Sequence, residues 1–189
     1  MTPGYYNVVI RSGSPPTTAS PRRAPDAASD ESGAATAPRG VRRARPDDAA
    51  AIEAMIRAVH AESPIHRVMP IDDRKLKGYI ADIIRSKVHA VFLHEGAAGI
   101  DGLYIGMLVQ QFFTLEVTAM DILFYVRPQR RGTRAAVRLW RAFKQWGEAR
   151  GAKAIQVGTM TEIDPARTAK FYRGMGLRDI GGVFHTRIG

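Results

Sequence analysis

The chain has 189 residues, of which 45% are hydrophobic and 24% charged, as expected for one ordinary globular domain. It contains 28 Lys and Arg against 18 Asp and Glu, a formal net charge of +10, which favours polyanionic partners such as nucleic acid or a phosphorylated small molecule. The chain has no cysteine, which excludes disulfides, thiolate metal sites and a cysteine nucleophile and agrees with a cytoplasmic location.

Neither the first residues nor the apolar runs resemble targeting or membrane segments. No apolar run approaches the ~20 residues that a membrane-spanning helix needs. The start, MTPGYYNVVIRSG, lacks a basic segment followed by a long apolar one. We therefore expect no signal peptide and no membrane span.

Residues 1–40 differ in composition from the rest of the chain. They hold six of the eleven prolines, together with many Ser, Thr, Ala and Gly residues. Ordering a residue costs roughly 1–2 kcal/mol, and this segment has too few apolar side chains to offset that cost. We predict a disordered tail at 1–40, in which Tyr5–Ile10 could form a short strand, and a folded domain at 41–189.

Hydrophobic periodicity divides the folded domain into helices and strands. In chain order, it predicts a strand at Val41–Ala44, a helix from Pro46 to His60, a loop at Glu62–Ile71, a helix from Asp72 to Ile84, strands at Val88–Leu93, Leu103–Phe113 and Ala119–Val126, a helix from Thr133 to Arg150, a strand at Ile155–Val157, a helix from Pro165 to Tyr172 and a closing strand at Val183–Ile188. This order predicts an α/β fold with a mixed sheet.

The segment after the strand 119–126 brings arginines and a glycine to the start of a helix. Pro128 ends the strand, Gly132 permits a close backbone approach, and Thr133 is the expected N-cap. The arginines are Arg130, Arg131 and Arg134. Helix N-termini attract phosphate because their N–H groups are unpaired. The segment therefore predicts either a site for a phosphorylated cofactor or a solvated basic helix start that touches nucleic acid.

A basic stripe continues along the same predicted helix. Its members are Arg134, Arg138, Arg141 and Lys144. This helical spacing is typical of the wet face of an amphipathic helix, and the alternative is a face that binds polyanions.

Three motifs in this order resemble the GNAT superfamily of N-acetyltransferases. Val126-Arg127-Pro128 followed by Arg131-Gly132-Thr133-Arg134-Ala135-Ala136 is similar to its cofactor loop, with Arg134 replacing the central glycine, as in some phage-encoded members. Tyr172-Arg173-Gly174-Met175-Gly176-Leu177 resembles the end of its last helix, although Pro165 stands where an Asn is common. Residues 41–48 resemble the first strand and helix entry. The resemblance covers about residues 41–189.

This resemblance implies a mixed, mainly antiparallel sheet flanked by helices. It also implies that strand 119–126 splays from strand 154–157, and that the opening seats the pantetheine arm of acetyl-CoA. The implied activity is transfer of an acetyl group from acetyl-CoA to a primary amine. Domains of this superfamily often dimerise, so a homodimer is one expectation.

The resemblance also names candidate site residues. The cofactor-binding residues that it implies are Phe124, Tyr125, Val126, Arg131, Gly132, Thr133, Arg134, Ala135 and Ala136. Tyr172 stands where the superfamily places the acid that protonates the thiolate, and the alternative is a packed aromatic residue. Asp121 is the candidate base, because an acid within an apolar strand is costly to bury unless it is used or paired. Its rivals are Glu116, Glu162, His60 and His66.

Other kinds of site find less support. No set of His, Asp and Glu has the spacing of metal ligands, so we expect no metal. The strong positive charge keeps a second hypothesis open, namely a nucleic-acid-associated protein that keeps the fold with little or no catalysis. An acyltransferase that acts on nucleic acid or its bound proteins would combine both hypotheses.

Overall fold

The computed structural model describes residues 40–186 of the chain. The predicted tail therefore lies outside the described residues except for Gly40, and so does the strand suggested at Tyr5–Ile10. Both remain predictions.

Five strands form one sheet in the order β1-β2-β3-β4-β5. They are β1 (Val41–Arg43), β2 (His89–Gly96), β3 (Gly99–Gln110), β4 (Val117–Val126) and β5 (Ala154–Gln156). The helices are α1 (Ala49–Glu62), α2 (Asp73–Arg85), α3 (Ala135–Ala149) and α4 (Pro165–Gly174), with short 3-10 turns η1 (Pro46–Asp48) and η2 (Pro128–Arg130). The first four strands pair antiparallel and β5 pairs parallel to β4. The expected mixed, mainly antiparallel α/β sheet is confirmed.

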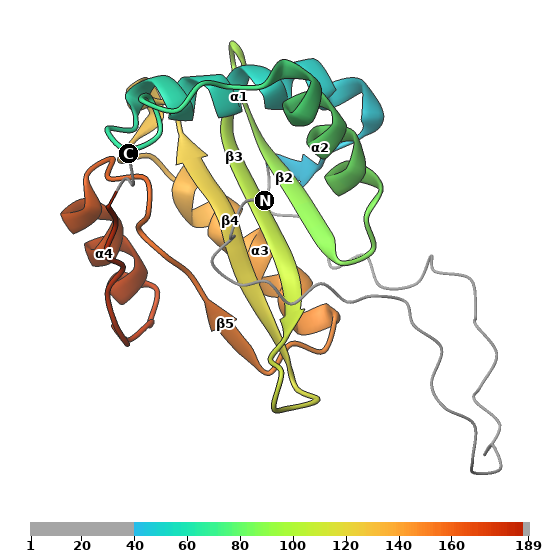
Figure 1. Cartoon of the computed structure of the whole chain (residues 1–189), viewed down its shortest axis with the longest axis vertical. Helices are drawn as coiled ribbons and strands as arrows, with labels where there is room; N and C mark the ends of the chain where they lie inside the picture. Colours follow the sequence, from blue (N-terminus) through green and yellow to red (C-terminus); the bar gives the residue numbers. More distant parts are fainter. Residues whose placement is uncertain (1–39, 187–189) are drawn as a thin grey trace, which may run out of the picture.

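Helices cover both faces of the sheet (Figure 1). On one face, α3 buries Phe143 and Leu139 against β3 and β4. On the other face, α1 and α2 bury residues such as Ile52 and Ile80 against β2 and β3. Gly106 of β3 lets α3 approach closely, since a Cβ there would lie 2.4 Å from the Phe143 ring. Within residues 40–186, no helix is both long and apolar enough to cross a bilayer.

Helix boundaries follow the predicted signals at most ends. Asp72 is the N-cap of α2, and its carboxylate accepts a hydrogen bond from the Lys75 N–H at 2.9 Å. At α3 the N-cap is Arg134, so the prediction of Thr133 was wrong. The Arg134 backbone is already helical, and the Thr133 hydroxyl accepts the Ala135 N–H at 3.3 Å from one residue further out.

The predicted closing strand is absent from the part of it that the structure describes. Residues 183–186 have no regular secondary structure, and 187–188 lie outside the described residues. The preceding pair Gly181–Gly182 favours irregular backbone. The Phe184 side chain is 90% exposed, so this segment has no buried face to hold it in the sheet.

A β-bulge interrupts β4 at Ile122. Gly106 pairs with Asp121 and Ile105 with Leu123, so Ile122 is an extra residue opposite β3. On the other edge, β4 pairs with β5 only from Thr118 to Met120. Beyond Met120 the two strands part, which confirms the expected splay. The bulge and the splay together leave an opening beside the second half of β4.

Candidate active site

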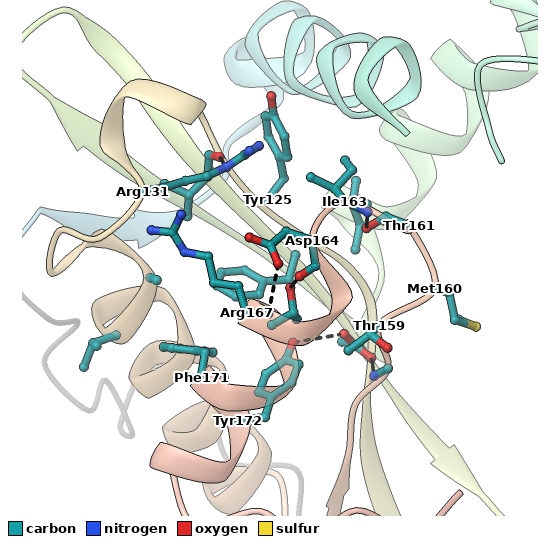
Figure 2. A pocket seen from close by; sticks show the side chains of 18 of the residues that line it. Tyr125, Arg131, Thr159, Met160, Thr161, Ile163, Asp164, Arg167, Phe171 and Tyr172 are labelled. Atoms are coloured by element: carbon teal, nitrogen blue, oxygen red, sulfur yellow. Dashed lines mark hydrogen bonds between the residues drawn. The ribbon is translucent and has the colours of Figure 1, made fainter. Parts of the chain in front are cut away.

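The opening beside β4 is a cavity of about 440 Å³. Its walls come from β4, the start of α3, the loop after β5, and α4 (Figure 2). The predicted residues that line it are Asp121, Phe124, Tyr125, Val126, Arg131, Gly132, Thr133, Ala136 and Tyr172. Predicted residues from three parts of the chain, namely β4, the start of α3 with its preceding loop, and α4, therefore meet at one cavity.

Asp121 lies at the inner end of the cavity, just before the bulge. Its Oδ1 accepts a hydrogen bond from the Gly158 N–H at 3.0 Å, which links β4 to the loop after β5. Burial raises the pKa of Asp121 to about 7, and hydrogen bonds from Gly158 and Tyr172 partly oppose that rise. A carboxyl with such a pKa can accept or release a proton near neutral pH.

Tyr172 reaches Asp121 from α4. Its hydroxyl donates to Oδ2 of Asp121 at 3.4 Å, and its ring packs against Phe124, Trp140 and Phe171. The side chain is 6% exposed. Burial, and then the nearby Asp121 charge, raises the pKa of Tyr172 well above its ordinary value. Tyr172 thus keeps its proton at neutral pH and can act as a donor.

The outer end of the cavity is formed by the loop before α3. Gly132 has a φ of +84°, a conformation that glycine adopts without strain. The first turn of α3 begins immediately afterwards, and Thr133 and Ala136 line the cavity there. This corner joins a glycine turn to the positive end of a 15-residue helix, an arrangement suited to an anionic group.

Arg167 adds a cation to this corner from the opposite wall. It lines the cavity, and its Nη2 lies 3.5 Å from the position that a Cβ on Gly132 would occupy. Figure 2 shows it reaching from α4 toward the loop that carries Arg131. Its guanidinium is therefore placed to meet an anion bound at the glycine turn.

Arg131 instead binds the end of α1. Its two terminal nitrogens pair with the Glu62 carboxylate at 2.5 and 2.7 Å, and its Nε–H donates to the Val126 carbonyl at 3.0 Å. The Tyr125 hydroxyl also donates to Glu62, at 3.0 Å. These bonds, Arg131 first, hold the pKa of Glu62 below its ordinary value. The Arg131 charge is thus already paired, and the side chain fastens the loop to α1.

Two predicted cofactor residues do not line the cavity. Arg134 is exposed as the N-cap of α3. The Ala135 side chain is 1% exposed and packs in the core on the α3 face of the sheet. The arginine that replaces the superfamily's glycine therefore lies beside the cavity rather than in it.

The loop after β5 forms the remaining wall, which carries Thr159, Met160, Thr161 and Ile163 (Figure 2). Buried Ser63 anchors this wall, because its hydroxyl donates to the Thr161 carbonyl at 2.6 Å. The loop ends at Asp164, which has a φ of +50° and caps α4 by accepting the Arg167 N–H at 3.0 Å.

The rival candidate bases have different positions. His66 lines the cavity, and burial, followed by the charges of His60 and His185, lowers its pKa. His60 binds the Met69 carbonyl through its ring at 2.6 Å, away from the cavity lining. Glu116 and Glu162 are exposed, and neither lines the cavity. Of the four rivals, His66 alone reaches the site.

Sequence reasoning missed the site roles of Arg167, Glu62 and Gly158. Arg167 could have been found from helical spacing. It lies four residues before Phe171, on the face of α4 that also carries Thr168 and Tyr172 and lines the cavity. Glu62 and Gly158 meet their partners across long sequence separations, for which no local spacing gives a signal. No group of three or more His, Asp or Glu residues within 40–186 is arranged to hold a metal ion.

Comparison with known proteins finds relatives in structure. No family model matches the chain, and no curated protein matches it in sequence. An aminoglycoside acetyltransferase from an uncultured soil metagenomic sample superposes with a TM-score of 0.61 at 19% identity, covering 79% of this chain and 97% of its own. The aminoglycoside acetyltransferase AAC(6')-Iy, solved with a bisubstrate analogue of coenzyme A and acetylneamine, gives 0.64 at 15% identity over 79% and 97%.

A protein described as a transcriptional regulator from Bacillus halodurans gives a TM-score of 0.64 at 14% identity, covering 78% of this chain and 98% of its own. At these identities the likeness shows the fold.

Proposed function

Because the chain has the GNAT acetyltransferase fold, we propose that it is an acyl-CoA-dependent N-acyltransferase that transfers the acetyl group of acetyl-CoA to a primary amine. The observation that carries this proposal is the cavity itself. It joins an anion-binding corner at the start of α3 to the Asp121–Tyr172 pair at the inner end.

The cavity walls suit the parts of acetyl-CoA in turn. The diphosphate fits the corner made by Gly132, the first turn of α3 and Arg167. Past the bulge, residues 124–126 face the cavity along a strand edge that β5 does not pair. That free edge offers backbone N–H and C=O groups to the amides of the pantetheine arm.

In the reaction a C–N bond forms between amine and acetyl carbon, and the thioester C–S bond breaks. Asp121, as the carboxylate, accepts the proton that the amine nitrogen loses. Tyr172 donates its proton to the departing sulfur. Because the two side chains are hydrogen-bonded, the proton on Asp121 can pass to Tyr172 and restore both groups. The net proton transfer is from nitrogen to sulfur.

Isothermal titration with acetyl-CoA and with acetyl-pantetheine tests the proposed binding. Wild-type protein should bind acetyl-CoA more tightly, because acetyl-pantetheine lacks the diphosphate. Arg167→Gln should weaken acetyl-CoA binding by about tenfold, the scale of one charged hydrogen bond, and leave acetyl-pantetheine unchanged. Lys170→Gln, on the same helix but not in the cavity lining, is the matched control. No acetyl-CoA binding at millimolar concentration would refute the proposal.

The basic surface of α3 favours a second candidate function, association with nucleic acid. Arg134 and Arg141 are exposed, Arg138 is half-exposed, and the chain carries a net charge of +10. Such a surface binds phosphate backbones with an affinity that falls steeply with salt. DNA binding with a steep salt slope, and no acetyl-CoA binding, would favour this function over acyl transfer.

A further inference from the structure

Asp101 and His94 form a buried polar pair that the proposed reaction does not use. Asp101 lies at the start of β3 and is 7% exposed, and His94 in β2 is 2% exposed. His94 Nδ1 lies 2.6 Å from Asp101 Oδ1. The other ring nitrogen, Nε2, is buried without a hydrogen-bond partner among the described residues. Burying an acid and an imidazole together is costly, so the contacts of this pair should serve a purpose.

The second carboxylate oxygen of Asp101 contacts the loop before α3. Arg130 Nε lies 2.8 Å from Asp101 Oδ2. The Asp101 carbonyl accepts the Arg127 N–H at 2.9 Å, and the Arg127 side chain donates to the Ile100 carbonyl at 3.2 Å. The start of β3 therefore holds the loop at both ends of η2, immediately before the glycine turn.

The backbone leaves space for this carboxylate at one glycine. A Cβ on Gly96 would lie 2.1 Å from Asp101 Oδ2, so any other residue there would displace the carboxylate. Asp101 and Arg130 line a separate cavity of about 490 Å³ and not the candidate active site. Their effect on a ligand in the active site must therefore pass through the loop.

We propose that Asp101, oriented by His94, is a positioning residue that sets the loop 130–133 for the diphosphate of acetyl-CoA through its ion pair with Arg130. This inference rests on the proposed function and extends it to residues outside the cavity. Arg130 and Arg127 hold one end of the loop to β3, and Arg131 holds the other side to Glu62. The glycine turn is thus fixed to the sheet on one side and to α1 on the other before any ligand binds.

Asp101→Asn tests this assignment. Asparagine keeps an oxygen for His94 and presents an amide NH₂ to Arg130, which releases the arginine. The dissociation constant for acetyl-CoA should rise by about tenfold, the scale seen when a residue that orients ligand-contacting groups is lost. The dissociation constant for acetyl-pantetheine should rise by less than about twofold. A residue that merely stabilises the fold would alter both ligands alike. If Arg130 bound the diphosphate directly, releasing it would tighten acetyl-CoA binding, so the direction of the change separates the two roles.

Two further variants keep the test decisive if Asp101→Asn folds poorly. Gly96→Ala displaces the carboxylate without changing its chemistry, and Arg130→Gln removes the loop partner, whose side chain is 45% exposed. Both should weaken acetyl-CoA binding selectively. Arg57→Gln is the control. It removes the ion pairs that Arg57 makes with Glu53 of α1 and Asp73 of α2, and it should leave the dissociation constants of both ligands unchanged.

The outcomes separate the two proposals. Selective loss of acetyl-CoA affinity in Asp101→Asn or Gly96→Ala supports the positioning role, whereas the same loss in Arg130→Gln shows only that the loop partner matters. Equal losses for both ligands, no loss, or tighter binding would overturn it while wild-type binding still supports the proposed function. Wild-type protein that binds neither ligand contradicts the proposed function itself.

Discussion

The hydrogen bond between Tyr172 and Asp121 couples the two groups that the proposed reaction needs. At 3.4 Å it is long, so each group remains available to a substrate. Burial moves both pKa values upward, which leaves Tyr172 protonated and Asp121 close to half-ionised near neutral pH. One environment therefore prepares a donor and an acceptor side by side.

Tyr172→Phe should lower kcat for amine acetylation by about a hundredfold, the lower range for loss of a general acid, because the thiolate loses its proton donor. The dissociation constant of acetyl-CoA should change little, since the ring and its packing remain. Steady-state kinetics with titration calorimetry separates the two effects. Tyr79→Phe, on α2 outside the cavity lining, is the control. An unchanged kcat in Tyr172→Phe would reduce Tyr172 to a packed aromatic residue.

The raised pKa of Asp121 predicts a bend in the pH profile. Below about 7 the carboxyl is protonated and cannot accept the amine proton. The slope of log kcat/KM against pH should therefore fall by one near pH 7, while the acceptor amine continues to titrate above it. Asp121→Asn should be slow and lack this bend. A bend that persists in this variant would assign the base to another group, with His66 the first candidate.

The same pKa predicts how stability depends on pH. The folded protein holds the Asp121 proton up to about pH 7, whereas the unfolded chain releases it near the ordinary value of 3.8. The contribution of Asp121 to stability is thus lost as pH rises from about 4 to 7. Relative to wild type, the free energy of unfolding of Asp121→Asn should increase over that range by at most about 4 kcal/mol, at ~1.4 kcal/mol per pKa unit. Urea unfolding at pH 4.5 and pH 8 measures this, and a constant difference would contradict it.

At the level of elements, the proposed function requires the glycine turn and helix α3 to act as one anion-binding unit. Gly132→Glu should raise the dissociation constant of acetyl-CoA by about a hundredfold, because it adds backbone strain and a negative charge at the diphosphate. Acetyl-pantetheine binding should be nearly unchanged. Gly151→Glu is the matched control, since Gly151 also has a positive φ, of +78°, but lies at the other end of α3. Equal effects of the two variants would place the diphosphate elsewhere.

Periodicity in the sequence predicted most elements because each has one clear buried face. Helix α2, for example, carries Leu76, Ile80, Ile83 and Ile84 at helical spacing, and all four pack in the core beneath it. The strand at Val183–Ile188 was wrong over its described part because strand-forming residues need a partner strand, which local sequence does not reveal. The bulge at Ile122 was also hidden, since it depends on the pairing of β4 with β3.

The candidate site was predictable only as far as local motifs extend. The motif residues from Gly132 to Ala136 and Tyr172 could be located from their register, and most of them line the cavity. The pairing of Arg131 with Glu62 joins residues 69 positions apart, and the contact of Arg167 with the glycine turn depends on how α4 packs. Such partners depend on tertiary structure, so the sequence alone could not show that the Arg131 charge is already paired with Glu62.

Across the whole molecule, positive charge predominates, whereas the charged residues that line the cavity balance one another. The arginines Arg131 and Arg167 balance the acids Asp121 and Asp164 among the lining residues, which leaves no excess negative charge. The solved structures of similar fold include proteins named aminoglycoside acetyltransferases, and aminoglycosides are amine-bearing sugars that are cationic at neutral pH. Here a net charge of +10 should repel such molecules during approach.

We therefore expect a monoamine to be a better acceptor than a diamine of the same length. With hexylamine and 1,6-diaminohexane as the pair, kcat/KM should favour hexylamine by several-fold at low salt, and added salt should narrow the gap as screening weakens repulsion. A thiol-release assay with acetyl-CoA measures kcat/KM for both amines at each salt concentration. A preference for the diamine that weakens with salt would instead indicate an acceptor surface of negative charge.

The extra residue in β4 makes the length of this strand decide which of its side chains share a face. Asp121 and Phe124 both face α4 only because Ile122 shifts the alternation of side chains between them. Deleting Ile122 would heal the ladder with β3 into an uninterrupted register. Asp121 and Phe124 would then point to opposite faces of β4, so Phe124 could no longer pack against α4 beside the Asp121–Tyr172 pair.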